Sequence, residues 1–213
     1  MAESSPRDVF INCPFDEDFA QGFRALVFAV RACGFRARCA REVDDGSETR
    51  LDKIYRIIEQ SRYGIHDISR TQLDELNGLP RFNMPLELGV FLGAKRFGGP
   101  AQRKKCALVL DTEPYRFQKF ISDLAGIDPT PHGGDPREMI RCTRAWLVTA
   151  SKRSSIPSPQ ALLESYDRFM EGFDQIAANA GLEPKAVAYP DYERLVVAWV
   201  KDNSGARPKR QPS

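Results

Sequence analysis

The sequence CALVLD at residues 106–111 is an unbroken apolar run that ends in an aspartate. A short apolar run of this kind is typical of a strand that is covered on both faces of a parallel sheet. Two further runs precede it in the chain, VFIN at residues 9–12 and YGIHDI at residues 63–68. The alternating segment at residues 35–40 predicts one more strand between these two.

Helical patterns separate the predicted strands. Apolar residues recur at spacings of three and four in residues 19–30 and again in residues 51–58, and residues 84–94 are mostly apolar. Regular alternation of strand and helix predicts a parallel sheet with right-handed crossovers. We therefore expect an α/β fold with a flavodoxin-like parallel sheet of four to five strands, the fifth near residues 126–130, and helices on both faces.

The last third of the chain is predicted to be helical. The predicted helices cover residues 139–148, 161–180 and 192–200, and a Ser- and Pro-rich linker or turn lies at residues 151–159. We expect an α/β domain over residues 1–150 and a helical C-terminal extension over residues 151–213 that ends in a disordered basic tail. The apolar positions of these helices suit core packing, self-association as a homo-oligomer, or contact with a partner protein.

Composition argues against several classes of protein. The 31 basic and 29 acidic residues leave a net charge of +2, so no nucleic-acid partner is expected. No apolar run is long enough to span a bilayer, and the polar start lacks the apolar core of a signal peptide. The five scattered cysteines lack metal-ligand spacing, so we expect buried thiols, no metal, no other cofactor and a cytoplasmic location.

Ligands of open parallel sheets bind at the carboxyl ends of the strands. That rule selects the loops that follow the predicted strands, at residues 12–18, 41–50, 67–83 and 111–115. The candidate ligand-binding residues in these loops are Asn12, Cys13, Pro14, Phe15, Asp16, Arg41, Arg50, Ser69, Arg70 and Asn83. For Cys13 alone a packing role is the favoured interpretation. His66 is expected to be half-buried, and His132, in a Pro/Gly turn, is expected to face solvent.

Glu87 stands out because it lies in an apolar helix, between Leu86 and Leu88 and near the start of that helix. One interpretation is that the carboxylate caps the helix and is stabilised by its dipole. The other is that the carboxyl group is partly desolvated, which raises its pKa and suits it to act as an acid or a base. The sequence leaves both interpretations open.

Two segments resemble known families. The segment FINCPF at residues 10–15 resembles the first-strand loop of nucleoside 2-deoxyribosyltransferases. The segment PLELG at residues 85–89 resembles the Glu-x-Gly helix of that family, in which the glutamate is the nucleophile. A flavodoxin-like layout with a glutamate after the third strand also occurs in TIR domains that cleave NAD. Residues 8–146 are thus similar to a bacterial family of TIR-like or deoxyribosyltransferase-like proteins.

The resemblance implies an enzyme that cleaves an N-glycosidic bond, with NAD or a related nucleotide as the leading substrate. Such cleavage passes through an oxocarbenium-like state, which Glu87 would attack or stabilise. Asp67 or Asp16 would orient ribose hydroxyls or handle a proton, and Arg41, Arg50, Arg70 or Arg81 would hold phosphates.

Two alternatives remain open. The first is a non-catalytic module that senses a nucleotide or self-associates, because one fold can serve both enzymes and adaptors. The second is a nucleoside deoxyribosyltransferase. The transferases usually carry an Asp-Gly-Thr turn before the glutamate, and residues 81–85 read RFNMP instead, which counts against that alternative.

Overall fold

The computed structural model describes residues 5–42, 45–71, 73, 78–124 and 126–203. Within these residues, one sheet of five parallel strands has the order β2-β1-β3-β4-β5, which is the order of flavodoxin-like folds. The strands are β1 (Ser5–Asn12), β2 (Arg36–Arg38), β3 (Ser61–Asp67), β4 (Cys106–Asp111) and β5 (Thr130–Pro131). The predicted fold class is therefore confirmed.

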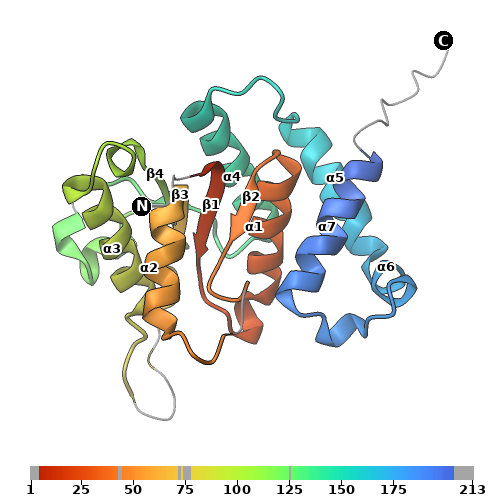
Figure 1. The fold of residues 1–213 in the computed structure, drawn as a ribbon, viewed down its shortest axis with the longest axis horizontal. Coiled ribbons are helices and arrows are strands. Elements are labelled where there is room, and N and C mark those ends of the chain that lie inside the picture. The colour runs from red at the N-terminus through yellow and green to blue at the C-terminus, as the bar shows by residue number, and fades with distance from the viewer. Residues whose placement is uncertain (1–4, 43–44, 72, 74–77, 125, 204–213) are drawn as a thin grey trace.

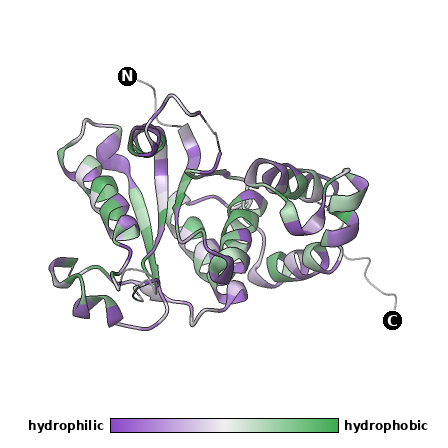
Figure 2. Cartoon of the chain, turned by 90° about the horizontal axis from the view of Figure 1, so that it is seen from below, coloured by the Kyte–Doolittle hydropathy of each residue, from purple (hydrophilic) through white to green (hydrophobic). Residues whose placement is uncertain are grey.

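Helices cover both faces of the sheet (Figure 1). One face carries α2 (Arg50–Gln60) and α3 (Asn83–Phe97), and the other carries α1 (Ala20–Ala32) and α4 (Pro136–Ser151). The helices α5 (Pro159–Glu171), α6 (Phe173–Asn179) and α7 (Tyr189–Asn203) lie beyond α1. In Figure 2 the strands carry both hydrophobic and hydrophilic segments, and the helices alternate between hydrophobic and hydrophilic residues, as expected for elements with one buried side.

Some element boundaries differ from the sequence prediction. The helix predicted over residues 161–180 is two helices, α5 and α6, which meet at Gly172, a residue of low helical propensity. The strand predicted over residues 35–40 is only three residues long. The fifth strand is shorter still, with two residues, Thr130 and Pro131, paired with Leu110 and Asp111 of β4.

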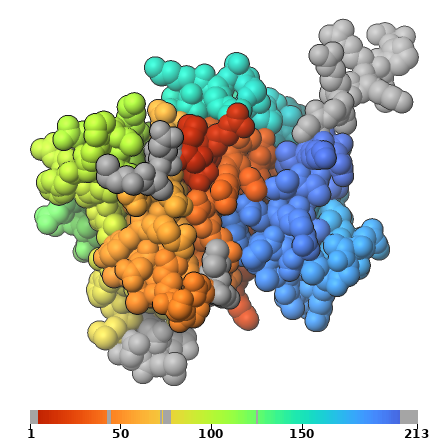
Figure 3. Space-filling model, in the orientation of Figure 1, coloured from red at the N-terminus to blue at the C-terminus, as the bar shows by residue number. Residues whose placement is uncertain are grey.

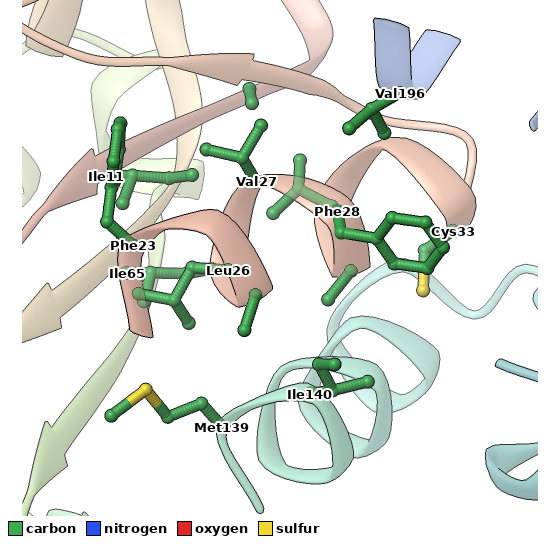
Figure 4. Close-up of a cluster of buried hydrophobic side chains, with 14 of the residues drawn as sticks. Ile11, Phe23, Leu26, Val27, Phe28, Cys33, Ile65, Met139, Ile140 and Val196 are labelled. Carbon is green, nitrogen blue, oxygen red and sulfur yellow. The ribbon is translucent and has the colours of Figure 1, made fainter. Parts of the chain in front are cut away.

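The core is centred on α1, which is buried on nearly all sides. Figure 4 shows its side chains between the sheet, Met139 and Ile140 of α4, and Val196 of α7. Phe28 also packs against the ring of Phe169 in α5, with ring centroids 5.4 Å apart. The C-terminal helices therefore share one continuous core with the sheet, and the basic tail at residues 204–213 lies outside the described residues.

All five cysteines are free thiols; four are buried, and Cys106 is half-buried. Among the described residues, no helix has both the length and the apolar character needed to cross a membrane.

Candidate functional site

A cleft of about 830 Å³ opens at the carboxyl ends of β1 and β3. These two strands are neighbours in the sheet but are separated along the chain by β2, so the cleft lies at the switch in strand order. Its walls come from the β1–α1 connection, the start of α2, the β3–α3 connection and the first turn of α3. Six of the ten predicted ligand-binding residues line it: Pro14, Phe15, Asp16, Arg50, Arg70 and Asn83.

The other four predicted residues lie around or beneath the cleft. Asn12, Cys13 and Ser69 are buried. Arg41 lies over the ring of Phe15, 5.1 Å from its centroid, and lines a smaller hollow next to α7. All ten therefore gather at one edge of the sheet, although only some of them can meet a ligand directly.

Acidic and basic side chains both line the cleft. Asp16, Glu17 and Asp18 come from the β1–α1 connection, and Arg50, Arg70 and Arg81 come from the other walls. The Arg70 guanidinium lies 3.2 Å from the Asp16 carboxylate and 3.0 Å from that of Asp18. Arg70 therefore joins two loops of the cleft, and part of its charge is already taken up by these two carboxylates.

Arg50 differs from Arg70. It is the first residue of α2, lines the cleft, and has no hydrogen-bond or ion-pair partner among the described residues. Guanidinium groups bind phosphate oxygens in pairs, and the amino-terminal ends of α2 and α3 both face this region. An anionic group in the cleft would therefore find its most available partner in Arg50.

Glu87 lies one turn beyond Asn83 and Met84, on the side of α3 that faces the sheet. Its side chain is almost fully buried, with 5% of the residue exposed. Burial raises the pKa of the Glu87 carboxyl from 4.5 to about 7, and the charge of Arg50 opposes this rise. As the fifth residue of α3, Glu87 lies beyond the first turn, so its position favours desolvation over helix capping.

Asp67 is fully buried and is not among the described residues that line the cleft. One carboxylate oxygen accepts hydrogen bonds from the Ser69 N–H at 3.0 Å and from the Ser69 hydroxyl. The other oxygen lies 3.0 Å from Nε2 of His132, in a close but bent contact that leaves both atoms outside hydrogen-bond geometry. As placed, Asp67 orders the loop after β3.

His132 was missed in the sequence analysis, and its predicted solvent exposure is wrong. It follows β5 directly and is 2% exposed, because the β5 ladder returns the chain over the end of β3. The Gly134 N–H donates to His132 Nδ1 at 3.0 Å, so Nδ1 is an acceptor, and Nε2 is the ring nitrogen that faces Asp67. Applying the strand-end rule to the fifth strand would have selected this residue.

Asn12 connects β1 to β3 and α3. Its Nδ2 donates to the Met84 carbonyl at 2.9 Å and to Nδ1 of His66 at 3.1 Å. Burial and the charge of Lys105 lower the pKa of His66 to about 3, so the ring is neutral and Nδ1 can accept. Asn12 thereby holds the first turn of α3, and with it the position of Glu87.

Cys13 is a poor candidate for a nucleophile. Burial raises the pKa of its thiol well above its usual value, and the charges of Asp67 and Glu87 raise it further. A neutral buried thiol is inert, since the thiolate is the reactive form. This environment supports the packing interpretation.

Arg116, which the sequence analysis also missed, ties the β3–α3 loop to the end of β4. Its guanidinium pairs with the buried carboxylate of Asp111 and donates to the Thr71 hydroxyl at 2.6 Å and the Ser69 carbonyl at 2.8 Å. The loop that carries Ser69 and Arg70 is therefore anchored from beneath.

No protein-family model matches the sequence, and a search of the curated proteins finds no relative. The resemblance to TIR domains and deoxyribosyltransferases therefore stays a prediction, and the function must be argued from the site.

Proposed function

We propose that the protein is a nucleotide N-glycosidase-type enzyme, with NAD or a related nucleotide as substrate and Glu87 as the central carboxyl group. The observation that carries the proposal is the burial of Glu87 one turn beyond Asn83 and Met84, which line a large cleft; this burial raises the pKa of Glu87 to about 7. Shifted carboxyl groups next to a cleft are frequent at catalytic sites.

The chemistry follows from this environment. Cleavage of an N-glycosidic bond builds positive charge on the sugar, which a nearby carboxylate stabilises or attacks. A carboxylate with little water around it interacts strongly with such a charge. With a pKa of about 7, the group is ionised in a large fraction of molecules at neutral pH.

The rest of the cleft suits a nucleotide. Arg50 lines the cleft and supplies a guanidinium for a phosphate, and its charge acts on the Glu87 carboxyl. Asp16 supplies a carboxylate for ribose hydroxyls, and Phe15, Leu73 and Met84 supply apolar surface for a base. Asp67 supports the site from beneath by holding Ser69.

The test is to incubate the protein with NAD, deoxynucleosides and nucleoside monophosphates and to measure the released base by chromatography. We expect Glu87→Gln, which keeps the size of the side chain, to lower the rate by about a hundredfold or more. Glu171→Gln, at an exposed position in α5, is the matched control and should retain full activity. Full activity of Glu87→Gln would remove the assignment.

A second candidate is a non-catalytic module that binds a nucleotide. Two observations favour it: Asp67 is buried and is not among the described residues that line the cleft, and Arg70 is held by Asp16 and Asp18. This candidate predicts that a nucleotide raises the melting temperature without being consumed, since selective binding to the native state stabilises it. Base release in the same sample would exclude it.

A cytoplasmic location is also proposed, and it is supported by the five free thiols. Four of these are buried in or near the core and would be inert in a reducing compartment. Fractionation of cells that produce the native chain would test it.

A further inference from the structure

The exposed apolar side chains of this protein are concentrated in one part of the fold. Among the described residues, nine large hydrophobic side chains are exposed. Seven of them belong to α2, α3 or the connection between these helices: Leu51, Tyr55, Leu73, Leu79, Phe82, Leu86 and Phe97. A concentration of this kind on a water-soluble fold indicates an interaction surface.

The helix α3 is apolar on its outward side as well as its inward side. Leu88 and Phe91 face the sheet and are buried, whereas Leu86 is 56% exposed and Phe97 is 85% exposed. A helix that is hydrophobic all round is normally covered all round. The outward side of α3 therefore lacks a cover within the described part of the chain.

The same side of α3 is also hollowed. Gly89 and Gly93 lie between Leu86 and Phe97 at helical spacing, and a Cβ added at either glycine would meet nothing within 4 Å. Next to them a groove of about 530 Å³ runs between α2 and α3 and includes Val90. Figure 3 shows these two helices, in orange and yellow-green, side by side on one face of the molecule.

We propose that this face is a homodimer interface, in which the α3 helices of two copies pack antiparallel about a two-fold axis near Val90 and Gly93. In that arrangement Leu86 of each copy lies opposite Phe97 of the other. The glycines meet near the axis, where small residues let two helix backbones approach closely. One surface thus presents both the protrusions and the hollows, as a two-fold interface requires.

The size and charge of the face fit a second copy. Leu73 lines the cleft instead, and the other six side chains are between 39% and 85% exposed. Side chains of this size then offer several hundred Å², the scale of the ~800 Å² that each partner buries in a stable interface. Lys95 and Arg96 lie in the last turn of α3, so antiparallel packing puts the two basic ends apart.

The C-terminal helices are a poorer candidate for this interface. Their apolar residues Leu162, Leu163, Phe169, Phe173, Leu195 and Val196 are buried in the chain's own core. Val197 is the large hydrophobic residue that they expose. The dimer proposal does not depend on the chemistry of Glu87.

The test is sedimentation velocity of the full chain at micromolar concentrations, where a dimer is expected. Gly93→Gln should fit within a single chain, because nothing occupies the space next to Gly93, but its side chain would hold two α3 helices apart. We expect it to weaken dimerisation by about tenfold or more, with an unchanged or higher melting temperature. Leu86→Lys should also yield monomers.

Val197→Lys is the matched control, since Val197 is an exposed apolar residue on α7, and it should leave the dimer intact. A wild-type chain that stays monomeric at tens of micromolar would overturn the proposal. A dimer that persists in both Gly93→Gln and Leu86→Lys would overturn it as well.

Discussion

The buried Glu87 carboxyl should lower the free energy of unfolding at neutral and alkaline pH. Glu87→Gln should remove this destabilisation. Burial raises the pKa of Glu87 from 4.5 to about 7. At about 1.4 kcal/mol per pKa unit, this rise corresponds to roughly 3 kcal/mol at a pH well above 7. Because the folded state binds the proton more tightly than the unfolded state, the free energy of unfolding falls as pH rises from 4.5 through 7. Below pH 4.5 both states are protonated and the cost vanishes.

The assay is urea denaturation of the wild type and Glu87→Gln between pH 4.5 and pH 8.5. We expect the difference in the free energy of unfolding between the variant and the wild type to grow by on the order of 2 to 3 kcal/mol across this range. Most of this change should occur between pH 5 and pH 8. Glu171→Gln, at an exposed position, should track the wild type at every pH. A difference between Glu87→Gln and the wild type that does not change with pH would refute the argument from desolvation.

Three further changes test other parts of the account. Arg50→Gln should raise the KM for a phosphorylated substrate by about tenfold or more in a chain that stays folded, and an unchanged KM would show that Arg50 does not hold the phosphate. Arg116→Ala leaves the buried carboxylate of Asp111 unpaired, and urea denaturation should show a loss of about 3 kcal/mol or more, whereas a loss below about 1 kcal/mol would contradict the anchoring role. Phe28→Ala removes a fully buried ring that packs between α1 and α5, and it should lower the free energy of unfolding by about 3 to 5 kcal/mol in urea denaturation. A smaller loss would mean that the C-terminal helices contribute little to the core.

The sequence predicted most of the fold because short strand-like segments alternate with helical patterns along residues 9–111, and the apolar run at residues 106–111 is the clearest of the strands. Residues 106–111 match β4 at both ends, and the cleft lies where the strand-end rule puts it. Glu87 was selected from its apolar neighbours and its place near the start of the helix, with its proposed role taken from the resemblance, and it is buried in the structure.

What the sequence could not supply depends on contacts between distant segments. His132 is buried because β5 pairs with β4 and brings the following turn over the end of β3. A strand of two residues is too short for the sequence to predict this packing. The pairing of Arg70 with Asp16 and Asp18 joins loops that lie more than fifty residues apart along the chain. Local patterns identify which residues are polar, but the approach of two loops decides which of them remain available to a ligand.

Release of nicotinamide from NAD by the wild type and by Glu87→Gln, measured in parallel at pH 7.5, tests the central claim most directly. The account predicts steady release by the wild type and a rate lower by about a hundredfold or more in the variant, with both chains equally folded. Equal rates in the two proteins would contradict the role of Glu87. A wild type that binds NAD without consuming it would instead identify the cleft as a nucleotide sensor.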